Sequence, residues 1–311
     1  MKGQTEEAKI STKNGVRRLV MVVIAVLLQV AWIIGLAVRL TKYYAAISTL
    51  ASVLALLLVF RVYGLRINSA YKISWIILIE LFPILGVCLY LMFGRTGALG
   101  PMRKWFDKVH TAYAHLLPQD EAIVDKLENA NAGLARQSEY LRKGAGYPVY
   151  QNTDVEFYGD TVQALEAQKA EMRRAKKFIF MEYHAIEDSV AWKGIEEILM
   201  EKAAEGLDVR VFYDDMGSIG FISKDFMEKL KRKGIKCRVF NPLMPILNVF
   251  MNNRDHRKIT VIDGKVGFTG GYNLANEYFN LTHPYGQWKD SGVKLTGDAV
   301  RSLTLIFMEM W

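Results

Sequence analysis

The sequence predicts an α/β domain that follows a region of transmembrane helices. Three observations lead to this fold class. Long apolar runs gather in the first hundred residues, strand-like and helical stretches alternate from about residue 146 onward, and the excess positive charge belongs entirely to the first third. Strands that alternate with helices of ten or more residues are typical of α/β folds.

Three apolar stretches follow one another near the N-terminus, at residues 19–38, 43–59 and 73–93. The first has no charge in twenty residues, which as a helix reach about 30 Å and match a bilayer core. A buried core helix is the alternative for any single stretch, but three in succession favour a membrane region. Glu80 and Pro83 interrupt the third stretch. A carboxylate is costly at mid-membrane and proline leaves a backbone carbonyl without a hydrogen-bond donor, so both residues argue against a third stretch that crosses the membrane fully. We therefore expect two to three membrane segments, the third re-entrant or shallow.

The position of the net charge of +8 decides its meaning. Residues 1–108 hold 14 Lys and Arg against 4 Asp and Glu, whereas the rest of the chain has a net charge of −2. Basic flanks orient membrane segments, and the positive-inside rule places the N-terminus and residues 61–72 in the cytoplasm. With a shallow third segment, the α/β domain is expected on the cytoplasmic side too. Its slightly negative charge argues against a nucleic-acid partner.

The chain divides into a membrane region at residues 1–100, a helical linker at 101–145 and an α/β domain at 146–311. An apolar fraction of 51% and only two cysteines exclude a disordered chain and a disulfide scaffold. Strands are expected at residues 155–158, 178–184, 209–214, 236–240, 259–262, 266–269 and 292–295. Helices of the domain are expected at residues 160–175, 192–205, 224–233 and 299–311.

One segment of the predicted domain has a pattern suited to phosphate chemistry. It runs from Asp255 to Gly264 and contains His-x-Lys-x-x-x-x-Asp. In an extended strand, His256 and Lys258 project to the same face. A neutral imidazole can attack phosphorus while a fixed cation stabilises the non-bridging oxygens. These two residues are the candidate catalytic pair, and Asp263 completes the pattern.

Small and polar residues follow this segment. Gly270 and Gly271 allow the backbone to approach a ligand closely, and Asn273 can donate to phosphate oxygens. A lone His-x-Lys is best read as a chance pair in a solvated turn. The longer pattern favours a phosphate site formed by Lys258, the two glycines and Asn273.

The complete pattern resembles the signature of the phospholipase D superfamily, HxKxxxxD followed by a small-residue pair and Asn. The resemblance implies that His256 forms a phosphohistidine and that Lys258 and Asn273 bind phosphate. It gives Asp263 a structural or orienting role. The fold that it implies is one phospholipase D-type α/β catalytic half.

Within the superfamily, the run HRKITVIDGKVGFTGGYNLANEY is similar to the first catalytic motif of bacterial cardiolipin synthases. The apolar region with Trp75, Pro83, Gly86 and Tyr90 is similar to their membrane region, so the resemblance extends from about residue 70 onward. It implies a multi-pass protein of the bacterial cell membrane. The implied reaction converts two phosphatidylglycerol molecules into cardiolipin and glycerol, with phosphatidylglycerol and the bilayer as partners and no cofactor.

The superfamily uses two such histidines, and this sequence contains one complete motif. None of the other four histidines is followed by Lys at the second position. We expect a second catalytic half, with its own histidine motif, to come either from a missing C-terminal part of the protein, which we favour, or from a second chain. Two other functions stay open: a phospholipase D-type phosphodiesterase or hydrolase, and a catalytically silent membrane fragment or interaction subunit.

Three other groups of polar residues are weaker candidates for a site. Glu182 follows a strand-like run and either contacts the catalytic pocket or lies on the surface at a strand end. Asp214 and Asp215 lack further ligands at useful spacing, and His110 and His115 point to different sides of a helix, so no metal site is expected.

Overall fold

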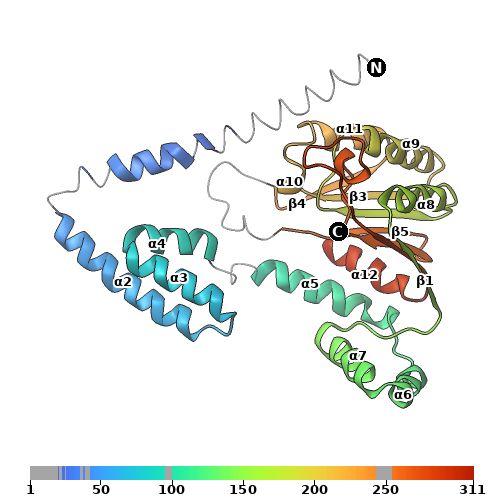
Figure 1. The fold of residues 1–311 in the computed structure, drawn as a ribbon, viewed down its shortest axis with the longest axis horizontal. Coiled ribbons are helices and arrows are strands. Elements are labelled where there is room, and N and C mark those ends of the chain that lie inside the picture. The colour runs from blue at the N-terminus through green and yellow to red at the C-terminus, as the bar shows by residue number, and fades with distance from the viewer. Residues whose placement is uncertain are drawn as a thin grey trace. The chain divides into compact units, whose positions relative to one another are not determined.

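The computed structural model describes residues 20, 23–24, 26–35, 38, 43–94, 100–242 and 254–311. The described residues form two compact units (Figure 1). The larger contains residues 102–242 and 254–311, and the smaller contains the helices that precede residue 102.

A seven-stranded mixed sheet forms the centre of the larger unit (Figure 1). The strands are β1 (Thr153–Tyr158), β2 (Phe178–Tyr183), β3 (Asp208–Asp214), β4 (Lys236–Phe240), β5 (Lys258–Ile262), β6 (Val266–Gly270) and β7 (Gly292–Gly297). Their order across the sheet is β1-β7-β6-β5-β2-β3-β4. The pairs β2–β3 and β3–β4 are parallel, and the other neighbours are antiparallel. Each of the seven predicted strands is confirmed.

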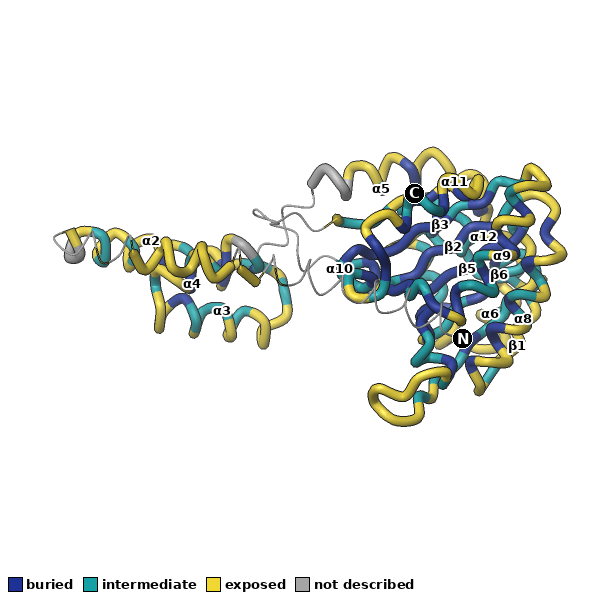
Figure 2. Tube along the Cα trace, turned by 90° about the horizontal axis from the view of Figure 1, so that it is seen from above, coloured by how far each residue is buried: buried dark blue, intermediate teal, exposed yellow. Residues whose placement is uncertain are grey.

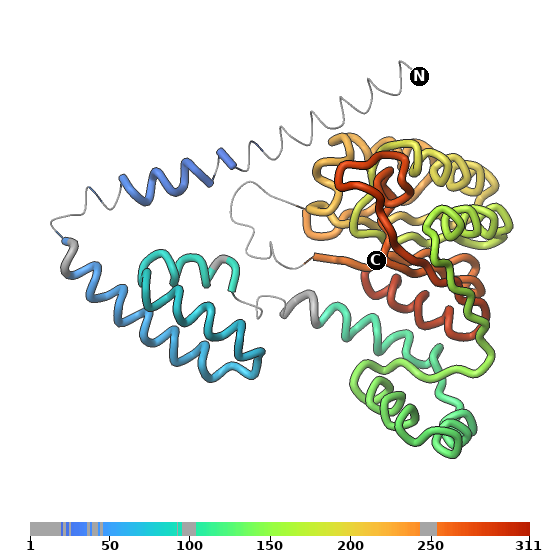
Figure 3. Tube along the Cα trace, viewed as in Figure 1, coloured from blue at the N-terminus to red at the C-terminus, as the bar shows by residue number. Residues whose placement is uncertain are grey.

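The connections explain this mixture. Parallel neighbours need a crossover, which α9 (Val190–Ala204) provides between β2 and β3 and α11 (Phe226–Arg232) provides between β3 and β4. The antiparallel pair β5–β6 needs only a turn, and Asp263 adopts a positive φ of 54° there. Figure 3 shows β1 in green beside the much later β7, with which it pairs from Thr153↔Gly297 to Tyr158↔Gly292.

Helices α8 (Thr161–Arg173), α9 and α11 cover one face of the sheet. Alternate strand residues point to this face, so Met181 and Val211 are fully buried against Trp192 and Ile195 of α9. Figure 2 shows the central strands in the colour of buried residues. Two short elements, α10 (Asp215–Ser218) and η5 (Asn276–Phe279), lie in the connections.

Helix α12 (Val300–Met310) covers the opposite face. The Phe307 ring is fully buried and stacks on Phe180 of β2, with 4.8 Å between ring centroids. A Cβ atom at Gly267 of β6 would lie 2.7 Å from a methyl group of Leu303. The glycine therefore lets α12 lie close to the sheet.

Helical elements occupy residues 100–145: α5 (Gly100–Tyr113), η4 (Ala114–Leu116), α6 (Glu121–Ala130) and α7 (Ala132–Ala145). His110 of α5 and Tyr147, just after α7, both contact α12. His110 Nδ1 lies 2.6 Å from Glu309 Oε1, and the Tyr147 hydroxyl donates to Glu309 Oε2 over 3.0 Å. Gly146 ends α7 with a φ of +76°. His110 is thus an interface residue that joins α5 to α12.

The smaller unit contains α2 (Tyr44–Gly64), α3 (Ser69–Leu81), α4 (Pro83–Leu89) and the π-helical turn η2 (Tyr90–Gly94). Pro83 begins α4, where its missing N–H costs nothing. A Cβ atom at Gly86 would lie 2.6 Å from the Cα atom of Ile79, so glycine lets α4 fold back onto α3. Trp75 and Tyr90 pack edge to face, with 5.3 Å between ring centroids.

The lengths of these helices limit how many of the predicted membrane segments can span a bilayer. Among the described residues, one helix is long and apolar enough to cross a membrane, at Ala46–Gly64, and the apolar helix Val26–Gly35 is shorter. Parts of the predicted segment 19–38 lie outside the described residues. The predicted segment 73–93 is not one helix: α3 has 13 residues and reaches about 20 Å, short of a bilayer core of about 30 Å. Several transmembrane helices are therefore not confirmed.

The packing of α12 leads to a stability prediction. Replacing Phe307 by Ala should lower the free energy of unfolding by about 3–5 kcal/mol, because a buried aromatic ring is lost and a cavity remains. Denaturant unfolding of the detergent-solubilised chain, followed by circular dichroism, measures this change. The control Phe157→Ala on β1, whose side chain is 68% exposed, should change it by less than about 0.5 kcal/mol. Equal effects of the two substitutions would contradict this account of the core.

Candidate active site

The predicted pair His256 and Lys258 meets where the chain enters β5. Lys258 is the first residue of this strand and is 5% exposed, whereas His256 lies just before it and is exposed. The Lys258 ammonium donates to the His256 carbonyl over 2.8 Å and lies 3.2 Å from His256 Nδ1. The structure thus brings an accessible imidazole and a nearly buried cation together.

The surroundings of this pair favour the neutral imidazole. Partial burial lowers the pKa of His256 from its usual 6.5, and the positive charges of Lys258 and His184 lower it further, while Asp255 and Asp214 oppose them. Burial also lowers the pKa of Lys258. At neutral pH, His256 therefore carries a lone pair beside a positive charge, as a nitrogen nucleophile for phosphorus requires.

His184, which belongs to no motif in the sequence, is the aromatic neighbour of His256. Their ring centroids are 4.6 Å apart. His184 follows β2 directly, and its ring Nδ1 lies 2.7 Å from the carbonyl oxygen of Asp255. It is not followed by Lys at the second position, so no motif search finds it. Only the pairing of β2 with β5 brings it beside the motif.

Two buried aspartates hold the segment before β5. Asp214 at the end of β3 is fully buried and accepts from the main-chain N–H groups of Asp255 and Gly217, each over 3.0 Å. Arg254 Nη1 lies 3.3 Å from the same carboxylate. The Asp255 carboxylate accepts from the Arg257 side chain over 3.0 Å. Asp214 thus fixes the backbone that leads to His256.

Among the described residues, no three His, Cys, Asp or Glu side chains gather as metal ligands would.

Asp263, the last residue of the motif, lies at the far end of β5, about 16 Å along the strand from Lys258. Its carboxylate accepts from the main-chain N–H groups of Lys176, Lys177 and Phe178 over 2.7–2.9 Å. These bonds hold the start of β2. The structure therefore separates Asp263 from the catalytic pair and gives it a structural contact.

Gly270, Gly271 and Asn273, the predicted phosphate-binding residues, all pack closely against other residues of the protein. A Cβ atom at Gly270 would lie 2.5 Å from the Ser291 carbonyl oxygen, and one at Gly271 would collide with the Asp290 carboxylate. Asn273 is 2% exposed; its carbonyl oxygen accepts from Ala185 N–H over 3.1 Å and its amide donates to the Tyr278 hydroxyl over 2.8 Å. Both polar groups of the Asn273 side chain are therefore hydrogen-bonded within the protein.

Glu182 does not lie on the surface. It is fully buried on β2, opposite Ile259, and faces α12, whereas Lys258 faces the other side of the sheet. Its Oε1 lies 2.9 Å from Arg257 Nε without the alignment of a hydrogen bond. Burial raises the pKa of Glu182 well above its usual value, and the charge of Asp255 adds to this effect while Arg257 opposes it. Glu182 therefore contacts the segment around His256 through Arg257 and Asp255, and not through Lys258.

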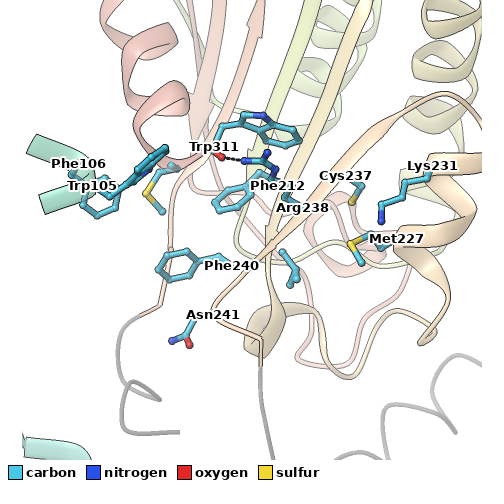
Figure 4. A pocket seen from close by; sticks show the side chains of 12 residues that line it. Trp105, Phe106, Phe212, Met227, Lys231, Cys237, Arg238, Phe240, Asn241 and Trp311 are labelled. Atoms are coloured by element: carbon cyan, nitrogen blue, oxygen red, sulfur yellow. Dashed lines mark hydrogen bonds between the residues drawn. The ribbon is translucent and has the colours of Figure 1, made fainter. Parts of the chain in front are cut away.

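A separate cavity of about 590 Å³ lies beside β4, α11 and the end of α12. Figure 4 shows Trp105, Phe106 and Phe240 on its wall, and Arg238 donating to the carbonyl oxygen of Trp311. None of the residues predicted for the catalytic or phosphate site lines it.

Comparison with known families agrees with this geometry. Residues 169–311 match the phospholipase D-like domain of cardiolipin synthase, and residues 51–95 match the N-terminal domain of phospholipase D nucleases. The second match covers the helices with Trp75, Pro83 and Gly86, and the first includes His256 and all seven strands except β1.

Several known proteins are similar to this chain. An uncharacterized protein of Streptococcus mutans is 38% identical over 79% of this chain and 53% of its own length. A cardiolipin synthase of Halalkalibacterium halodurans is 34% identical over 77% of this chain and 48% of its own. The chain thus spans about half the length of the curated relatives it matches. The solved structure of Nuc from Salmonella typhimurium, a phospholipase D family member, is 18% identical over 51% of this chain and 94% of its own, with a TM-score of 0.39.

The contacts of Asp263 predict a loss of stability. Asp263→Ala should lower the free energy of unfolding by about 1–3 kcal/mol, because three main-chain N–H groups lose a charged acceptor. Denaturant unfolding measures this change. Lys265→Ala in the same turn is the control and should have little effect, because its side chain is exposed. An unchanged midpoint for Asp263→Ala would contradict the structural role.

Proposed function

This chain belongs to the cardiolipin synthase family of phospholipase D-like proteins, and on that premise we propose that it forms a catalytic half of a membrane phosphatidyltransferase. The observation that carries the proposal is the contact between an exposed, neutral His256 and the nearly buried Lys258. The substrate is phosphatidylglycerol, and the products are cardiolipin and glycerol.

In the first step, His256 attacks the phosphorus of one phosphatidylglycerol. A P–N bond forms, the P–O bond to the terminal glycerol breaks, and the glycerol oxygen takes a proton from a general acid. Lys258 donates toward His256 Nδ1 before substrate binds. The phosphate draws this ammonium toward its non-bridging oxygens, which leaves the imidazole free to carry its proton on Nδ1 and its lone pair on Nε2.

In the second step, a hydroxyl of another phosphatidylglycerol attacks the phosphohistidine. The P–N bond breaks, a new P–O bond forms, and the group that acted as acid takes the proton of the attacking hydroxyl. Each cycle therefore restores His256. Water in place of the lipid hydroxyl would release phosphatidic acid instead, so the fate of the phosphohistidine separates a transferase from a hydrolase.

The acid in this scheme is a second histidine, from another catalytic half that carries its own HxKxxxxD motif. His110, His115, His184 and His283 do not have the HxK pattern, so we place the second histidine on another polypeptide segment or a second copy of this chain. The length of the curated relatives supports this arrangement, since they are about twice as long as the region matched.

The helices that precede residue 102 supply proximity to the lipid. The helix Ala46–Gly64 is long and apolar enough to span a bilayer, and Leu57 and Phe60 on it are 61% and 66% exposed. Anchoring at the membrane raises the effective concentration of a lipid substrate. We propose a multi-pass protein of the bacterial cell membrane, with α3 and α4 shallow and the catalytic domain on the cytoplasmic side, in line with the basic flanks.

The role of His256 is tested by His256→Gln. With the second half supplied, cardiolipin formation from phosphatidylglycerol vesicles should fall by about 10⁴-fold or more, because the nucleophile is lost. Lipid mass spectrometry measures cardiolipin, phosphatidic acid and glycerol together. His283→Gln, at an exposed histidine outside the site, is the matched control and should keep full activity. Cardiolipin synthesis by His256→Gln at the normal rate would refute the proposal, and phosphatidic acid as the main product of the unaltered protein would favour a hydrolase.

The pH dependence follows from the lowered pKa of His256. The attacking form is neutral, so kcat/KM should fall as the pH drops through the pKa of His256 in the free enzyme. Because this pKa lies below 6.5, the midpoint of the acid limb should lie below pH 6.5. Initial rates in mixed micelles between pH 5 and 8 measure it. A midpoint above 6.5 would contradict the electrostatics of the site.

A further inference from the structure

Residue 184 binds the chain on both sides of His256. Its main-chain N–H donates to the Arg257 carbonyl over 3.1 Å. Its ring Nδ1 lies 2.7 Å from the Asp255 carbonyl oxygen. A carbonyl oxygen only accepts, so Nδ1 of His184 must carry the proton and donate. The neighbours that flank His256 are thus both hydrogen-bonded to the same residue.

The His184 ring is itself enclosed. On one side it meets the His256 ring, with an interplanar angle of 56°. Gly217 of α10 also lies against this ring, and a Cβ atom there would come within 2.8 Å of two ring carbons of His184. The Ser218 hydroxyl donates to the His184 carbonyl over 3.5 Å, a long bond. The ring has therefore little freedom to turn away from His256.

This placement rules out one role and supports another. A general acid must stand across the phosphorus from the nucleophile, but rings with centroids 4.6 Å apart leave no space for a phosphate between them. A residue that holds the plane of the nucleophile affects how well it meets phosphorus, and small misplacements of reacting groups cost large factors in rate.

We infer that His184 is the positioning residue of the nucleophile, which fixes the His256 imidazole through its ring contact and through its hydrogen bond to the Asp255 carbonyl. This inference rests on the proposed role of His256. Lys258 binds the phosphate independently of His184, so His184 substitutions should lower kcat and leave KM nearly unchanged.

The charged groups around His256 give a readout that needs no activity. They are Lys258 from β5, His184 after β2, Asp255 before β5 and Asp214 from the end of β3. Partial burial lowers the pKa of His256 most, Lys258 and His184 lower it further, and the two aspartates raise it. Removing the His184 imidazole leaves the aspartates in place, so the pKa of His256 should rise.

Two substitutions separate the contacts. His184→Phe keeps an aromatic ring against His256 and removes the donor to Asp255. His184→Asn keeps a short N–H donor and removes the ring. The full chain has five histidines, so Cε1-labelled imidazoles in detergent micelles can each be assigned by single substitution and titrated by NMR. His115→Asn, at an exposed histidine outside the site, is the control.

Both His184 variants should raise the midpoint of the His256 titration and lower kcat about tenfold, the effect of losing one hydrogen bond or a comparable contact, with KM changed less than about twofold. His115→Asn should change neither. If one variant fails to fold, the other gives the same readouts.

An unchanged His256 titration and an unchanged kcat in the folded variants would overturn the inference. A fall in kcat that merely follows the loss of folded protein, at an unchanged titration midpoint, would also overturn it. If the unaltered protein makes no cardiolipin with its second half present, the proposed function fails, but the NMR titration still decides whether His184 positions His256.

Discussion

The site depends on the pairing of the central strand β5 with β2 and β6. All five residues of β5 are buried, and antiparallel neighbours hold it on both sides. Its first residue, Lys258, is paired with Tyr183, and this register places His184 beside the segment that carries His256. The residue after its last, Asp263, binds the main chain that begins β2. One end of β5 thus carries the reactive residues of the motif, His256 and Lys258, and the other end carries Asp263, whose contacts are structural.

The two faces of the sheet divide the charged groups. Lys258 and Thr260 face α8, where Gln168 donates to the Thr260 hydroxyl over 2.9 Å. Arg257 and Glu182 lie on the α12 side, away from the reacting groups. Burial of Glu182 favours its protonated form, which limits the negative charge near Asp255. The lone pair of His256 is preserved because partial burial lowers the pKa of its imidazole and the cation Lys258, on the same face of the sheet, lowers it further.

In the smaller unit, a glycine and a proline divide one apolar run into two short helices that pack against each other. Two short helices lie against each other where Gly86 meets the backbone of Ile79, a contact that any side chain at residue 86 would prevent. The turn between them uses Pro83, whose ring cannot continue α3. A run of apolar residues long enough to cross a bilayer is thereby divided into two helices, and among the described residues α2 alone keeps the length of a span.

The sequence by itself determined the local elements and the reactive pair. Apolar alternation and glycine breaks located every strand of the sheet, and the spacing of His256 and Lys258 was enough to predict that they meet, because both properties depend on neighbouring residues. The tertiary structure decided the rest. Glu182 faces away from Lys258 because of the β2–β5 register, which alternation within one strand does not reveal. His184 and Gly217 became part of the site only because three strands bring distant segments together, and hydrogen bonds between such segments leave no periodic trace in a sequence.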